Sequence, residues 1–113
     1  MLDKIEILGE LGFKQNVAKT IFYLVESSQP VTSREIETGM RLRQPEVSLA
    51  LKELRDRGWI NVTIKKKRGK GRPALCLTPK TEQIKKDVIE DINKKIKTLE
   101  EMREELERWW SKE

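Results

Sequence analysis

Histidine is absent from this chain of 113 residues, and cysteine occurs once, as Cys76. The usual zinc ligand sets combine several cysteines and histidines, and a lone cysteine cannot close an internal disulfide. Nucleophilic catalysis also lacks its usual base, and the carboxylates fall at solvent-facing spacings of expected helices. We therefore expect no catalytic residue, no metal site and no cofactor, and we interpret Cys76 as a small core residue.

Long apolar runs are missing as well. No stretch approaches the roughly 20 apolar residues that a membrane span requires, and residues 1–4 lack the layout of a signal peptide. We expect a cytoplasmic protein without a membrane partner. Apolar residues make up only 36% of the chain and aromatic residues 5%. This composition favours one compact unit plus an extended element over a single large core.

Charge is abundant but unevenly distributed. Charged residues make up 38% of the chain and the net charge is +5. By segment, the formal charges sum to −2 over residues 1–40, +8 over residues 41–72 and −1 over residues 80–113. A basic segment between near-neutral ones is typical of a surface that docks a phosphate backbone.

Apolar spacing predicts three helices in the first 41 residues. The first covers residues 2–11, and the second, over residues 15–27, carries a strong apolar stripe typical of a core helix. Pro30 interrupts the chain, and a third helix of about two turns then begins, because Thr32 and Glu35 have the spacing of a capping box. It is expected to end around Arg41.

A fourth helix is expected over residues 44–57, with Pro45 at its first position and Gly58 after its end. At about 100° per residue, its side chains divide between two faces. The expected core face holds Val47, Ala50, Leu51 and Leu54, and the expected exposed face holds Pro45, Ser48, Leu49, Lys52 and Asp56.

The pattern then changes from helix to strand. Residues 59–64 are β-branched or aromatic with a period near two, residues 65–72 form a basic, glycine-containing turn, and residues 74–77 make a second short strand that Pro79 ends. From Lys80 onward there is neither glycine nor proline. We expect a mostly α fold with a small β-hairpin, divided into residues 1–79 and a long helix over residues 80–113.

This order of elements is typical of a winged helix-turn-helix. Residues 32–36 (TSREI), 44–54 (QPEVSLALKEL) and 57–60 (RGWI) resemble the DNA-binding domain of prokaryotic, in particular archaeal, MarR-like and TrmB-like regulators. The likeness covers about residues 10–79. It implies a cytoplasmic transcription regulator that binds double-stranded DNA, with the helix from Gln44 as recognition helix, the hairpin as wing and flanking helices as the homodimer interface.

Two positions depart from the family's pattern. Many relatives have glycine where this chain has Arg41, at a position that often takes a left-handed backbone. That conformation costs a non-glycine residue roughly 1 kcal/mol, so we expect a differently built turn. Relatives also often place arginine at the position of Leu49, where an apolar side chain could contact thymine methyl groups.

The expected DNA contacts divide between the fourth helix and the hairpin. Gln44 has the geometry to pair with adenine and Arg43 with guanine, whereas Lys52 suits phosphates. The competing interpretation is an ordinary solvated helix face. The full expected set comprises Ser33, Arg34, Arg43, Gln44, Pro45, Ser48, Leu49, Lys52, Lys66, Lys67, Arg68, Lys70 and Arg72.

The hairpin turn concentrates six positive charges in eight residues, 65–72. Residues 68–73 (RGKGRP) resemble an AT-hook, which inserts arginines into narrow minor grooves. A solvated turn is the alternative. A nucleotide-binding loop is excluded for two reasons. The residues after Gly71 enter an expected strand instead of a helix, and no Gly-Lys-Ser/Thr motif follows.

Apolar residues of the last helix recur at a mean step of about 3.57 residues, and a 30-residue helix rises roughly 45 Å. A second chain is expected to cover this stripe. The expected dimer residues are Leu2, Ile5, Ile84, Val88, Ile92, Ile96, Leu99, Met102, Leu106 and Trp109.

Two other functions stay open. The first is a winged-helix module that docks protein or RNA within a larger assembly, which binding to duplex DNA with a steep salt dependence would exclude. The second is an enzyme, which would need a cofactor or a second subunit.

Overall fold

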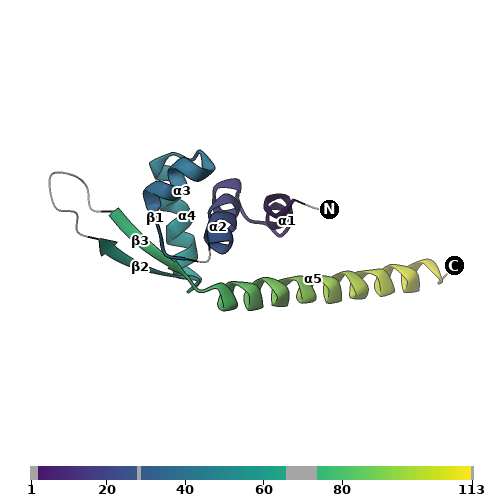
Figure 1. The fold of residues 1–113 in the computed structure, drawn as a ribbon. Coiled ribbons are helices and arrows are strands. Elements are labelled where there is room, and N and C mark those ends of the chain that lie inside the picture. The colour runs from purple at the N-terminus through teal and green to yellow at the C-terminus, as the bar shows by residue number, and fades with distance from the viewer. Residues whose placement is uncertain (1–2, 28, 66–73, 113) are drawn as a thin grey trace. The chain divides into compact units, whose positions relative to one another are not determined.

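A computed structural model describes residues 3–27, 29–65 and 74–112 (Figure 1). The chain divides into two compact units, Met1–Gln83 and Ile84–Glu113. Across the described residues there are five helices and three strands. The expected class, mostly helical with a small antiparallel β component and a long C-terminal helix, is confirmed.

The first unit begins with four helices, α1 (Lys4–Glu10), α2 (Gln15–Ser27), α3 (Ser33–Met40) and α4 (Gln44–Asp56). Side-chain caps fix where two of them start. The Asp3 carboxylate accepts a hydrogen bond from the Ile5 N–H at 3.0 Å, and the Thr32 hydroxyl accepts one from the Glu35 N–H at 3.2 Å. Each cap satisfies a backbone donor that lacks a helical partner.

A small antiparallel sheet completes this unit. Its strands are β1 (Val31–Thr32), β2 (Ile60–Lys65) and β3 (Ala74–Pro79), in the order β1-β3-β2. Leu77, fully buried on the central strand, lies opposite Val31 on one side and Val62 on the other. The hairpin of β2 and β3 was expected from the sequence, whereas β1 was not.

The core of the first unit forms where α2, α3, α4 and the sheet meet. The largest fully buried side chains are Trp59, Leu24, Ile36, Leu54, Leu77, Val47 and Thr20. Thr20 is tolerated there because its hydroxyl donates a hydrogen bond of 2.8 Å to the Asn16 carbonyl. The Arg57 guanidinium lies 4.7 Å from the ring centre of Phe13 and 5.0 Å from that of Trp59, so it stacks against both rings at the end of α4.

Three expectations about this unit need correction. Pro45 occupies the second position of α4, because the helix begins at Gln44. Cys76 is half-buried instead of fully buried, since it lies on the thin sheet with Thr32 and Thr63 as its neighbours across the strands. Arg41 itself takes the left-handed conformation, with φ 54° and ψ 48°, so the expectation of a turn that avoids this conformation was wrong.

The long helix α5 (Thr81–Trp110) has 30 residues and makes up most of the second unit. Ion pairs one turn apart support it, such as Lys95 with Asp91 at 3.0 Å. No helix among the described residues is long and apolar enough to cross a membrane.

Candidate nucleic-acid interface

The exposed face of α4 is the central feature of the candidate site. The four residues expected to point into the core, Val47, Ala50, Leu51 and Leu54, are all buried. The five expected to point outward, Pro45, Ser48, Leu49, Lys52 and Asp56, are all exposed, as is Gln44. The helix is therefore held rigidly by one side and presents polar side chains and one leucine on the other.

The first turn of α4 is fixed by contacts from two directions. The Asn16 side-chain amide, on α2, donates a hydrogen bond of 2.8 Å to the Glu46 carbonyl. The Glu46 carboxylate in turn accepts one of 3.0 Å from the Arg43 N–H. These contacts set the position of the helix start, where Gln44 and Arg43 lie.

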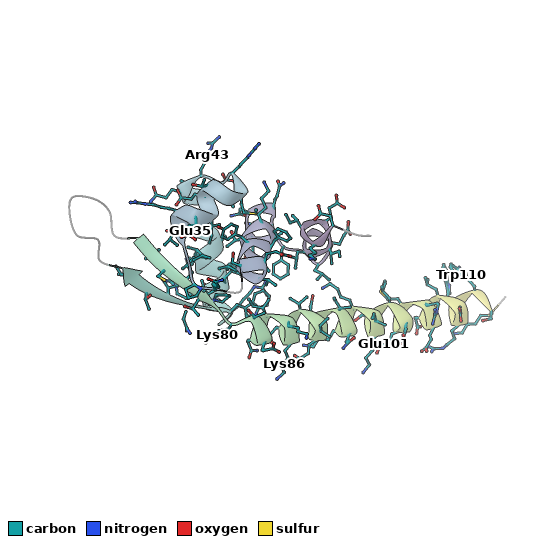
Figure 2. All side chains as sticks on the ribbon, viewed as in Figure 1. Glu35, Arg43, Lys80, Lys86, Glu101 and Trp110 are labelled. Carbon is teal, nitrogen blue, oxygen red and sulfur yellow. The ribbon has the colours of Figure 1, made fainter. Side chains whose placement is uncertain are left out.

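The turn between α3 and α4 consists of Arg41, Leu42 and Arg43. Leu42 is buried, and its N–H donates a hydrogen bond of 2.9 Å to the Glu37 carbonyl. Arg41 and Arg43 are exposed on either side of this anchor. Figure 2 shows Arg43 projecting outward from the start of α4.

Two open hollows flank the exposed face of α4. The first, of about 280 Å³, is lined by Ser33 and Glu37 of α3, by Ile64 and Leu75 of the sheet, and by Gln44, Val47, Ser48 and Leu51 of α4. The second, of about 310 Å³, is lined by Lys14, Asn16, Val17, Leu49, Lys52, Glu53 and Asp56. The fold therefore brings Ser33, Gln44 and Ser48 together, and places Leu49 and Lys52 along the neighbouring hollow.

Of the other expected contacts, Arg34 lines neither of these two hollows, and those of the hairpin turn lie outside the described residues. Arg34 is half-buried on α3 and makes an interaction of its own within the chain. The expected hairpin contacts Lys66, Lys67, Arg68, Lys70 and Arg72, together with the AT-hook-like segment, lie outside the described residues. The two strands that flank them are paired up to Lys65 and Ala74.

The apolar stripe of α5 is exposed over most of its length. Ile96, Leu99, Met102, Leu106 and Trp109 are between 43% and 64% exposed. Toward its N-terminal end, Val88 and Ile92 are half-buried and Ile84 is buried. Of the two expected contacts outside α5, Ile5 is half-buried and Leu2 lies outside the described residues.

One exposed apolar residue of α5, Ile89, was missed from the sequence. The steps of four from Ile84 to Ile96 pass over Ile89. Its spacing of seven residues from Ile96 was the signal that could have placed it on the stripe.

No group of acidic, cysteine or histidine side chains suited to a metal occurs among the residues that the structure describes. The chain matches no protein-family model and no curated protein. Its function is therefore inferred from the chemistry and geometry of the site itself.

Proposed function

We propose that this protein is a sequence-specific transcription regulator of the winged helix-turn-helix type, which binds double-stranded DNA as a cytoplasmic homodimer. In this proposal α4 enters the major groove, residues 65–72 act as a basic wing on the backbone or in the minor groove, and α5 joins two chains. No enzymatic step is part of the proposal.

The observation that carries the proposal is the exposed row on α4. Gln44, Ser48 and Lys52 follow each other at steps of four, so they lie along one line of the helix, and all three are exposed. Glutamine, serine and lysine side chains present the donors and acceptors that base edges and phosphates match in the major groove. The opposite face of the same helix is buried, which supports α4 as a rigid reading element.

The distribution of charge supports a nucleic-acid partner. Residues 41–72 carry a net charge of +8, and this segment includes the turn before α4, α4 itself, β2 and the basic residues 65–72. Neutralising phosphates with such side chains releases counterions, which supplies much of the affinity for DNA.

The apolar stripe on α5 supports a second copy of the chain as its cover. Exposed apolar surface that extends along a helix marks an interaction site more often than a free surface. Pairing of two identical helices is a common way to bury such a stripe. A dimer would also present two copies of α4 to the two half-sites of a palindrome.

A second function has one observation in its favour. Leu49 on α4 and Ile64 on β2 are each 66% exposed, on either side of the row that includes Ser48. Such side chains could dock a protein partner, as they would in an interaction module within a larger assembly. In a DNA complex, Leu49 would instead contact thymine methyl groups.

Selection on random duplex DNA, followed by titration of the selected site at several salt concentrations, separates the two functions. A regulator of this kind enriches a defined sequence and shows a steep linear fall of log affinity with log salt. Failure to enrich any sequence, together with weak binding that salt barely changes, would leave the interaction module as the better account.

A further inference from the structure

Arg41 occupies a backbone position that favours glycine. It follows the last residue of α3 with φ 54° and ψ 48°, and it is the only non-glycine residue with positive φ in the described parts of the chain. The Cβ atom of an L-residue is crowded in this conformation, which is why glycine is the usual residue after a helix end. Arginine is therefore strained here where glycine would not be.

Arg43, two residues later, also occupies a position that favours other residues. It is the N-cap of α4, and its side chain makes no capping hydrogen bond. Serine, threonine, aspartate and asparagine are preferred at an N-cap because their side-chain oxygens accept from the first free N–H groups, and a guanidinium has no acceptor. At both positions of the turn, Arg41 and Arg43, arginine stands where another residue type would stabilise the local backbone better.

No contact with another described residue offsets the unfavourable backbone positions of these two arginines. Both are exposed, and neither guanidinium makes an ion pair or a hydrogen bond with another described residue. Leu42 between them is buried and holds the backbone of the turn in place. Residues that are unfavourable for their backbone positions, and that make no stabilising contact within the described chain, are typical of sites that bind a partner.

The chemistry of the turn matches a phosphodiester. A guanidinium offers five donors in a planar fork that fits phosphate oxygens, and it stays charged at all physiological pH values. The turn leads directly into the first turn of α4, whose free N–H groups carry a partial positive charge. Arg43 directly precedes Gln44, the first residue of the proposed reading row, and Arg41 lies two residues earlier in the chain.

We infer that Arg41 contacts the DNA backbone. In this inference Arg41 and Arg43 lower the stability of the fold and strengthen its binding to phosphate. This inference rests on the proposed function, because the phosphate belongs to duplex DNA. It assigns a role to Arg41, the residue that makes the turn unusual. It also predicts that replacing either arginine with the residue favoured at its position raises the stability of the fold and weakens DNA binding.

The test compares Arg41→Gly and Arg43→Ser with the wild type in thermal unfolding and in titrations of a 30-base-pair duplex carrying the selected site. Both variants are expected to melt a few degrees higher, because each receives the residue that its backbone position favours. The proposed dimer brings two copies of Arg41 to one duplex. Arg41→Gly is therefore expected to lower the slope of log affinity against log salt by about 1.8, or about 0.9 per copy, which makes the fall in affinity between roughly 50 and 200 mM salt about 12-fold smaller.

Two control variants separate the effect of the proposed phosphate contact of Arg41 from the effect of removing any positive charge. Arg41→Lys keeps both the charge and the strain, so its melting temperature and most of its salt slope should stay as in the wild type. Lys97→Ala removes one exposed positive charge on α5, far along the sequence from the turn, and should leave affinity and slope unchanged.

The inference is overturned if Arg41→Gly binds with the affinity and salt slope of the wild type, or if it melts lower than the wild type. The proposed function fails separately, if the wild type itself binds no duplex. A higher melting temperature combined with weaker, less salt-dependent binding supports the inference.

Discussion

The side-chain amide of Asn16 on α2 donates a hydrogen bond of 2.8 Å to the carbonyl of Glu46 in the first turn of α4. This contact joins two helices through residues that lie 30 positions apart in the chain, and it fixes the end of α4 that the proposal places in the major groove. Asn16 lines the hollow beside Leu49 and Lys52 without belonging to the exposed row itself.

Replacing Asn16 with alanine should therefore loosen the start of α4. The Glu46 carbonyl would be left without this donor, so the free energy of unfolding should fall by about 1 kcal/mol, measured by chemical denaturation. Discrimination between DNA sequences should fall as well. Gln15→Ala, at an exposed neighbouring position, is the matched control and should change neither quantity. Equal effects of the two substitutions would contradict this role for Asn16.

Gly39 on α3 should not tolerate alanine. A Cβ atom there would lie 2.5 Å from Cε2 of Tyr23, on α2, so the two helices would have to move apart or the ring would have to shift. We expect Gly39→Ala to lower the free energy of unfolding by about 1–3 kcal/mol.

Gly9 provides the comparison for Gly39. It lies in α1 with no atom within 4 Å of a built Cβ, so Gly9→Ala should raise the free energy of unfolding by about 0.5–1 kcal/mol. Both free energies can be measured by urea denaturation. Changes of the same sign at the two glycines would show that close packing at Tyr23 is not the constraint.

Periodicity predicted much of this fold because the relevant elements each have one buried face. The division of α4 into a buried and an exposed side followed from its helical spacing, and α2 was predicted with its observed bounds. The strand β1 has two residues, Val31 and Thr32, and pairs only through tertiary contact with β3. Two residues carry no periodicity, so no local pattern could predict that strand.

The candidate site was less accessible from sequence than the fold. The role of Asn16 depends on a contact across 30 residues, which a local pattern does not encode. Arg41 was expected to avoid the left-handed conformation on grounds of local energy, but the buried Leu42 beside it holds the turn. Ile84 is buried whereas the later residues of the same stripe are exposed, a difference that helical periodicity alone does not encode.

Substitutions on the stripe of α5 should convert the protein to a monomer. Leu99→Glu with Leu106→Glu places two charges on residues that are 62% and 43% exposed and that the proposed dimer would bury. Sedimentation at micromolar concentration should show a monomer with unchanged helix content. Lys97→Glu, an exposed change outside the stripe, should stay dimeric. If the double variant sediments as a dimer, the interface lies elsewhere.

The basic hairpin turn should supply affinity without sequence choice. Replacing Lys66, Lys67, Arg68, Lys70 and Arg72 with alanine should weaken binding to all duplexes and reduce the salt slope by about 0.9 for each phosphate that the protein no longer neutralises. Titrations of the selected site and of an unrelated duplex measure both effects. A salt slope equal to that of the wild type would exclude the hairpin as a DNA-binding element.

The most direct test of sequence-specific recognition by α4 is binding selection on random duplex DNA, carried out in parallel with the wild type and with Gln44→Ala. The wild type should select a palindrome whose half-sites are centred about 10 base pairs apart, because paired recognition helices on one face of DNA meet it one turn apart. Gln44→Ala should select the same palindrome with relaxed preference at one base pair in each half-site, where one base contact discriminates by roughly 1–3 kcal/mol. An asymmetric site, or identical preferences for the two proteins, would contradict the assignment of α4 as the reading helix.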